Sequence, residues 1–153
     1  MLKSLLPIFL FSLVFLPGCK TDANKSTTEA APSPTYPSIE VARIEFLANN
    51  ATYMDATFYN LPISINQSEL EQIRATLATI STEPIIVPAG AKPIAHIWFQ
   101  VNGKNVEDAD LYFQEDCVGY VWYEAGKPAY SNQLTKDGVM FYNNIIQSVP
   151  GQQ

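Results

Sequence analysis

The sequence predicts an α+β fold, an antiparallel β-meander with a leading β-hairpin and two helices packed on one face. Three observations indicate this class. Residues 94–101 alternate between apolar and polar side chains and run directly into Asn102-Gly103, a dipeptide typical of two-residue hairpin turns. Residues 117–124 are rich in β-branched and aromatic side chains, as strands are. Residues 68–80 begin with a capping box and place apolar side chains at helical spacing.

The leading hairpin is expected within residues 39–60. Residues 39–47 read as a strand that places Ile44 and Phe46 on one face, and residues 52–60 read as its partner. Asn49-Asn50 supplies the turn between the two strands, because asparagine tolerates turn conformations well.

The first helix is expected to begin at Ser68, which forms a capping box with Glu71. Its apolar residues recur at spacings of three, four and three, which places them on one face. That predicted buried face consists of Leu70, Ile73, Leu77 and Ile80. Residues 85–87 then form a short apolar run bracketed by prolines, which predicts a strand at a sheet edge.

The meander is expected to occupy the last part of the sheet and to lead into a closing helix. Its strands are residues 94–101, a return strand to about residue 113, residues 117–124 and residues 128–134. Thr135 can cap the closing helix, and Pro150-Gly151 ends it.

The first 19 residues carry a targeting pattern. Lys3 gives the amino terminus a positive charge, and residues 5–16 are almost wholly apolar. That run is too short for a stable membrane helix, which needs about 20 residues. The run ends in Leu16-Pro17-Gly18-Cys19, which resembles the lipobox of bacterial lipoprotein precursors.

This resemblance implies that diacylglycerol alkylates Cys19, that cleavage follows Gly18, and that the new amine is acylated. Residues 1–18 are then a lipoprotein signal peptide. Two or more acyl chains hold a protein firmly on a membrane, whereas one chain does so only marginally. Lys20 rather than aspartate follows the cysteine, which in such lipoproteins implies sorting to the outer membrane. The expected location is the bacterial cell envelope, with the membrane bound through the lipid on Cys19.

Residues 19–38 are expected to form an acylated cysteine followed by a disordered tether, because their Pro, Ser and Thr offer little apolar surface to offset ordering entropy. Residues 39–150 then form a single small globular domain. From residue 39 onward there are 6 Lys+Arg against 13 Asp+Glu, a net charge of −7. This balance argues against a nucleic-acid partner and against flat contact with anionic lipid.

No complete set of catalytic residues stands out. Beyond Cys19 the chain has one thiol, Cys117, and its one histidine is His96, so these two are the only Cys–His nucleophile pair available. A cysteine packed in the core is the competing interpretation, and we favour it. One histidine and one thiol do not make a tetrahedral zinc site, and we expect neither a metal nor a cofactor.

An acidic cluster flanks residues 111–113. It could form a calcium site at a hairpin end or paired carboxylates for glycan cleavage. Its spacing matches no EF-hand loop, and we favour a solvated turn and a charged strand edge that resists edge-to-edge pairing. The cluster consists of Glu107, Asp108, Asp110, Glu115 and Asp116.

Tyrosine and tryptophan side chains concentrate on the predicted meander. They bury large areas at low entropic cost and keep a polar group, which suits a binding interface. The alternative is a two-sided core roofed by helices and loops. The candidate binding surface consists of Trp98, Tyr112, Tyr120, Trp122, Tyr123 and Tyr130.

The function expected from these features is non-catalytic. We expect an envelope lipoprotein whose domain binds another envelope protein, as an inhibitor, an immunity-type protein or an assembly accessory. One alternative is a module that binds a glycan or a small ligand in a pocket lined by the aromatic rings. A further alternative is a hydrolase that uses Cys117 and His96.

Overall fold

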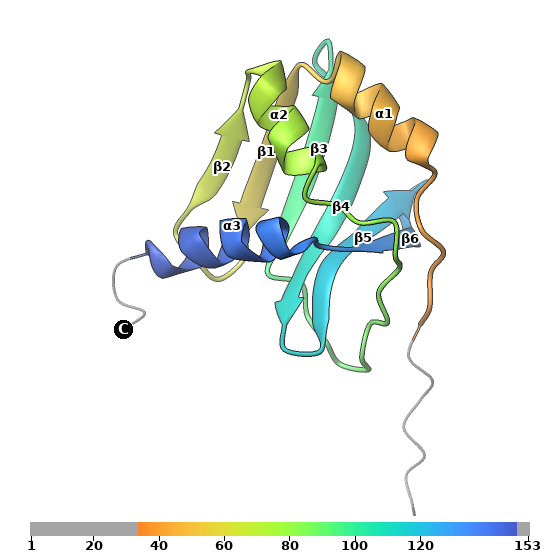
Figure 1. The fold of residues 1–153 in the computed structure, drawn as a ribbon, viewed down its shortest axis with the longest axis vertical. Helices are drawn as coiled ribbons and strands as arrows, with labels where there is room; N and C mark the ends of the chain where they lie inside the picture. The colour runs from red at the N-terminus through yellow and green to blue at the C-terminus, as the bar shows by residue number, and fades with distance from the viewer. Residues whose placement is uncertain (1–33, 150–153) are drawn as a thin grey trace, which may run out of the picture.

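The computed structural model describes residues 34–149 as one six-stranded antiparallel sheet with three helices (Figure 1). The expected signal peptide, Cys19 and residues 19–33 of the expected tether lie outside the described residues. The strands follow the order β2-β1-β3-β4-β5-β6, so β3 to β6 form a meander and the predicted α+β class is confirmed. The elements are α1 (Val41–Asn50), β1 (Tyr53–Phe58), β2 (Ser64–Gln67), α2 (Leu70–Leu77), β3 (Ala95–Val101), β4 (Lys104–Gln114), β5 (Cys117–Glu124), β6 (Lys127–Gln133) and α3 (Lys136–Gln147).

All three helices cover the same face of the sheet (Figure 1). Leu47 of α1, Ile73 of α2 and Tyr142 of α3 belong to one buried cluster with the strands. Because side chains alternate along a strand, every second strand residue points into this core. We call this side the helix-covered face and the opposite side the open face. The strand members of the core are Met54, Ala56, Phe58, Ala95, Ile97, Phe99, Ala109, Leu111, Tyr120 and Trp122.

The prediction of a strand at residues 39–47 is wrong, because most of this run lies in α1. Leu47 is fully buried, whereas Phe46 is 48% exposed, a pattern that fits a helix. Apolar residues in this run recur at spacings of two, typical of a strand, and also of three and four, typical of a helix. Periodicity alone therefore does not distinguish a strand from a helix here. Pairing with β2 and β3 occupies both edges of β1, so no further strand can join it. The leading hairpin is therefore formed by β1 and β2.

The two predicted helices form, although their caps differ from expectation. Ile73 and Leu77 of α2 are buried as predicted. The expected capping box is not formed, because α2 starts after Glu69 without a side-chain cap, and Glu71 instead pairs with Arg74 at 2.6 Å. In α3 the predicted cap is confirmed, since the Thr135 hydroxyl accepts a hydrogen bond from the Gly138 amide at 3.2 Å.

The hairpin turn predicted at Asn102-Gly103 is also confirmed. It joins β3 to β4, and both residues have positive φ, 51° at Asn102 and 75° at Gly103. Asparagine and glycine adopt this left-handed conformation most readily, so the pair fixes the register of the two strands. That register places His96 opposite Asp110 and Trp98 opposite Asp108.

Two residues proposed for the binding surface, Tyr120 and Trp122, lie instead in the core. Both side chains are completely buried on the helix-covered face. The Tyr120 and Tyr142 hydroxyls form a hydrogen bond with each other, and the Trp122 indole donates to Asn132 at 3.0 Å. Their polar groups are therefore satisfied inside the protein, and Tyr120 and Trp122 cannot contribute to a binding surface.

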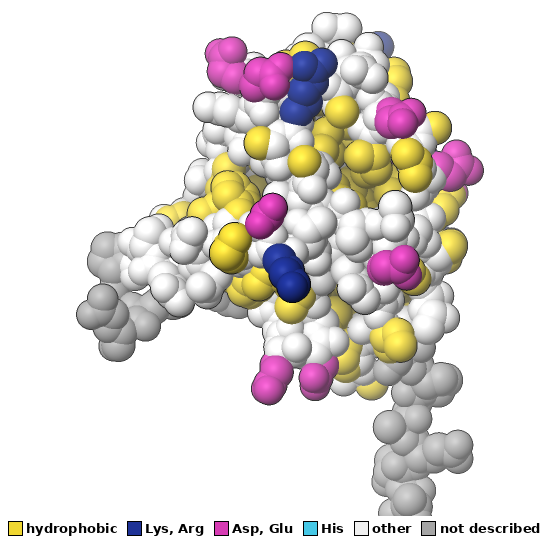
Figure 2. Space-filling view, in the orientation of Figure 1, with side chains coloured by type: hydrophobic (Ala, Val, Ile, Leu, Met, Phe, Trp, Pro, Cys, Tyr) yellow, Lys and Arg dark blue, Asp and Glu magenta, His cyan; other side chains and the backbone are white. Residues whose placement is uncertain are grey.

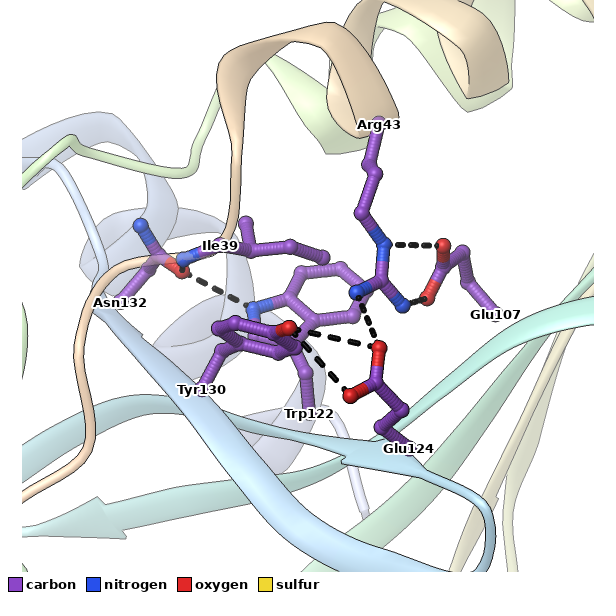
Figure 3. A network of polar contacts seen from close by, with 7 residues as sticks. All are labelled: Ile39, Arg43, Glu107, Trp122, Glu124, Tyr130 and Asn132. Carbon is purple, nitrogen blue, oxygen red and sulfur yellow. Dashed lines mark hydrogen bonds and ion pairs between the residues drawn. The ribbon is translucent and has the colours of Figure 1, made fainter.

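Asn132 is a buried polar residue that joins three parts of the chain (Figure 3). Its side-chain oxygen accepts hydrogen bonds from the Trp122 indole at 3.0 Å and from the Ile39 amide at 3.2 Å. Its side-chain nitrogen donates to the Ser81 carbonyl at 2.8 Å. The backbone beside it is also closely packed, because a Cβ at Gly119 would lie 2.2 Å from the Asn132 carbonyl oxygen. The amide thereby holds the chain before α1, the chain after α2 and the core of β5 together.

Arg43 anchors α1 to the far strands of the sheet (Figure 3). Its guanidinium makes two hydrogen bonds to Glu107 on β4, at 2.7 and 2.6 Å, and one to Glu124 on β5 at 3.2 Å. It also lies over the Tyr130 ring, 4.9 Å from the ring centre. The Glu107 side chain is only 9% exposed, so solvent screens its pair with Arg43 less than it screens a surface ion pair.

The outer edge of β6 is covered by other parts of the chain. The Ser131 amide donates to the Pro37 carbonyl at 2.8 Å, and the Gln133 amide donates to the Glu83 carbonyl at 2.7 Å. The predicted edge strand at residues 85–87 is reduced to a single bridge between Ile86 and Thr35. That segment instead packs Ile85 and Val87 against Cys117 and Val121 on the sheet, while the Pro37 and Glu83 carbonyls satisfy backbone groups of β6 that would otherwise be open to pairing.

We expect Asn132→Leu to lower the free energy of unfolding by about 3 kcal/mol, because it leaves the Trp122 indole, the Ile39 amide and the Ser81 carbonyl without their partner. Urea unfolding followed by tryptophan fluorescence measures this change. Asn105→Leu, at an exposed position of β4, is the matched control, and its expected cost is below about 0.5 kcal/mol. Equal losses in the two variants would contradict the role given to the Asn132 amide.

Candidate binding site on the open sheet face

The open face of the sheet gathers polar and aromatic side chains that the helices do not cover. The strand registers place Asp55 of β1 opposite Trp98 of β3, and His96 of β3 opposite Asp110 of β4. Alternation along the strands then defines the rest of this surface. Its central members are Tyr53, Asp55, Thr57, His96, Trp98, Gln100, Asp108, Asp110, Tyr112 and Tyr123. Val121 of β5 also points to this side but is buried with Ile85, Val87 and Cys117.

Asp110 is the centre of the polar contacts on this face. Its Oδ1 accepts a hydrogen bond from the Tyr59 hydroxyl at 3.1 Å and lies 2.8 Å from His96 Nδ1. Its Oδ2 accepts a hydrogen bond from the Tyr123 hydroxyl at 2.8 Å. The residue is only 6% exposed. A buried carboxylate needs partners of this kind, so Asp110 orders the side chains that surround it.

His96 lies between two carboxylates and two aromatic rings. Its Nε2 is 3.2 Å from Asp108 Oδ2, while its Nδ1 faces Asp110. Its ring centre is 4.4 Å from that of Trp98 and 5.7 Å from that of Tyr123. These contacts fix the imidazole on both sides. The Asp108 side chain is 37% exposed, so it is the carboxylate of this pair that solvent and a ligand reach.

The open face has a negative charge. Its positions on β1, β3 and β4 include three carboxylates, Asp55, Asp108 and Asp110, and neither lysine nor arginine. One histidine cannot neutralise three carboxylates in either of its protonation states. The domain as a whole carries 6 Lys+Arg against 13 Asp+Glu from residue 39 onward. A ligand for this face is therefore expected to be cationic.

Tyr59 and Tyr123 on this face stay protonated at neutral pH. Partial burial, with the nearby Asp110 carboxylate, raises the pKa of Tyr59 to about 12. Burial and the hydrogen bond to Asp110 also raise the pKa of Tyr123. Both phenols therefore remain donors to Asp110, and their rings remain neutral surfaces against which a cation can stack.

Cys117 and His96 are not brought together. His96 pairs across the sheet with Asp110, which pairs with Val121, and Cys117 lies four residues from Val121 along β5. That offset alone is roughly 13 Å at about 3.3 Å per strand residue. Cys117 instead packs with Ile85, and burial raises the pKa of its thiol. A nucleophilic pair of these two side chains has no geometric basis in this fold.

The acidic cluster of the sequence is divided among three places. Glu107 points to the helix-covered face and binds Arg43. Asp108 and Asp110 lie on the open face with His96. Glu115 and Asp116 are exposed at the turn between β4 and β5. Within residues 34–149, no group of three or more His, Cys, Asp or Glu side chains could hold a metal ion.

The predicted aromatic surface is retained in part. Trp98, Tyr112 and Tyr123 lie on the open face, and Tyr112 packs near Cys117 at one end of it. Tyr130 lies on the helix-covered face beneath Arg43. Tyr59, which is 54% exposed, was not predicted, although it continues the alternation of Asp55 and Thr57 along β1.

Comparison with known proteins offers no guide to this site. No family model matches the chain, and no curated protein or solved structure is significantly similar to it. Among residues 34–149, none of the helices is long and apolar enough to cross a membrane. The role of the open face is therefore inferred from its own chemistry.

We expect Asp110→Ala to lower the free energy of unfolding by about 1 to 3 kcal/mol, because His96, Tyr59 and Tyr123 lose a shared acceptor. Thermal or urea denaturation measures the change. Asp116→Ala, at the exposed turn, should change stability by less than about 0.5 kcal/mol. If the two variants were equally stable, Asp110 would not be the residue that orders this face.

Proposed function

We propose that this protein is a membrane-anchored envelope lipoprotein whose domain is non-catalytic and binds a basic surface of another envelope protein. The observation that carries the proposal is the open face, an ordered aromatic and acidic surface that the helices leave uncovered. The lipobox resemblance at Cys19 supports the anchor. The expected tether of residues 19–38 is shorter than predicted, because Thr35 and Pro37 make backbone contacts with the folded domain; residues 19–34 would link lipid and domain.

The chemistry of the open face suits arginine and lysine side chains. Trp98 and the neutral rings of Tyr59 and Tyr123 offer faces for cation–π contact, and Asp108 offers an accessible carboxylate. Protein interfaces are rich in such aromatic anchors. The contacts around Asp110 hold these groups in place before binding, which reduces the entropy lost on association.

A glycan or a small cationic ligand is the second candidate, because stacked rings beside carboxylates also fit such molecules. That function needs a concave pocket to enclose most of the ligand. A hollow of about 660 Å³ lies between β2, α2 and α3 on the helix-covered side, and none of the open-face rings lines it. The shape of the sheet therefore favours a protein partner.

Crosslinking and pull-down of the full chain from envelope membranes tests the binding surface. We expect one stoichiometric partner, crosslinked through lysine- or arginine-rich segments, and its capture should fall about tenfold with Trp98→Ala. Asp108→Asn should weaken capture and reduce its dependence on salt concentration.

Met140→Ala is the control for this experiment, because Met140 is 58% exposed on α3, away from the open face. Circular dichroism establishes that each variant is folded. Equal capture by the Trp98 and Met140 variants would exclude the open face as the binding surface, and recovery of no partner would favour the small-ligand candidate.

The anchor is tested by Cys19→Ala. We expect loss of labelling by radioactive palmitate and release of the protein from the membrane fraction, because the lipid holds a domain whose net charge opposes contact with anionic lipid. Cys117→Ala is the matched control and should leave both labelling and fractionation unchanged. Palmitate labelling that survives Cys19→Ala would contradict the proposed lipidation site.

A further inference from the structure

The two outer strands of the sheet, β6 and β2, differ in whether other parts of the chain cover their free edges. The edge at β6 is covered by residues 35–37 and 83–86, which accept or complete its backbone hydrogen bonds. The edge at β2 pairs with β1 on its inner side, and within residues 34–149 no backbone segment pairs with its outer side. Natural proteins usually protect such an edge with charge, proline or a covering segment. The sequence of β2, Ser-Ile-Asn-Gln, contains neither charge nor proline.

A groove runs beside this edge on the helix-covered side. It has a volume of about 660 Å³ and lies between β2, α2 and α3. Figure 1 shows that α3 crosses the sheet and reaches the β2 edge with its carboxyl-terminal end. Figure 2 shows hydrophobic side chains gathered above α3 toward that edge. The apolar residues of the groove are Ile63, Ile65, Ala75, Phe141 and Ile145.

We propose that the outer edge of β2 accepts an extended segment of a second protein as a seventh strand, with alternate apolar side chains of that segment in the groove. Strand addition of this kind draws affinity from main-chain hydrogen bonds and specificity from pockets for every second side chain. The open edge of β2 supplies main-chain groups for the hydrogen bonds, and the groove between α2 and α3 supplies the pocket for side chains.

The charges around the groove indicate a basic segment and argue against a second copy of this chain. None of the residues that line the groove is charged. Glu69 and Glu71 lie at the start of α2, next to the end of β2. Glu71 is paired with Arg74 at 2.6 Å, so within residues 34–149 Glu69 is the acidic residue at this end without an ion pair, and Figure 2 shows acidic side chains beside a basic one here. The last turn of α3 has no basic residue, so its negative dipole end is not compensated. Two acidic chains would repel each other here, whereas a segment with lysine or arginine beside its apolar residues is attracted.

This surface is separate from the open face. Its apolar side chains belong to the opposite side of the sheet, and no residue that lines the groove contacts the cluster around Asp110. The proposed strand addition therefore does not depend on the function proposed above, and variants of Trp98 or Asp108 should leave it unchanged.

The test uses the full chain in detergent and a fluorescein-labelled peptide that alternates valine and threonine and carries two lysines at one end. Fluorescence anisotropy should report binding, and hydrogen exchange should show new protection of backbone amides in Ser64–Gln67 with none in Lys127–Gln133. Replacing the threonines by proline removes the main-chain donors and should weaken binding at least about tenfold. Replacing the lysines by glutamate should also weaken it.

A matched pair of arginine substitutions, at Ala75 and Ala78, tests the groove. Ala75→Arg places a bulky cation in the groove and should weaken peptide binding about tenfold. Ala78→Arg, at an exposed position of the same helix end that does not line the groove, should not change it. Both positions are exposed, so both variants should fold.

Several outcomes would overturn the proposal. The first two are that the peptide does not bind measurably and that proline in the peptide does not weaken binding. The others are that the Ala75→Arg and Ala78→Arg variants bind the peptide equally, and that the protected amides lie on β6 instead of β2. Sedimentation should show a monomer without peptide. Concentration-dependent dimers with protected β2 amides would assign this edge to a second copy of the chain and would likewise overturn the proposal.

Discussion

The buried amide of Asn132 is the interaction on which the arrangement of this domain depends. It binds the backbone before α1, the backbone after α2 and the indole at the centre of β5. Each of these groups would be unsatisfied inside the protein without it, which is costly in an apolar environment. It thereby joins the segment that enters α1 and the segment that leaves α2 to the core side of β5.

No helix covers the open face; Ile85 and Val87 pack over its β5 part, and the remainder is ordered without a cover. Asp110 takes hydrogen bonds from two tyrosines and lies against His96, so the side chains around it hold one arrangement without a covering helix. Asp108 and Trp98 stand at the accessible side of this arrangement. A rigid surface that combines rings with uncompensated negative charge is suited to a cationic partner, because little ordering entropy is lost when binding occurs.

The two free edges of the sheet, at β6 and β2, also differ from each other. Chain segments before α1 and after α2 run along β6 and satisfy its outer backbone groups, while β2 has no such cover in the described part of the chain. The same helices that build the core form the walls of a groove beside β2. The domain thus presents two surfaces of different chemistry, one acidic and aromatic, the other apolar with an open strand edge.

The sequence by itself determined the meander, the turn at Asn102-Gly103, the apolar face of α2 and the cap of α3, because these depend on neighbouring residues. It also predicted an acidic domain with aromatic strands. The tertiary structure decided that residues 39–47 are mostly helical, because β2 and β3 already occupy both edges of β1. It also decided which aromatic rings are exposed. Alternation shows which side chains share a face, but only the docking of the helices shows which face is buried.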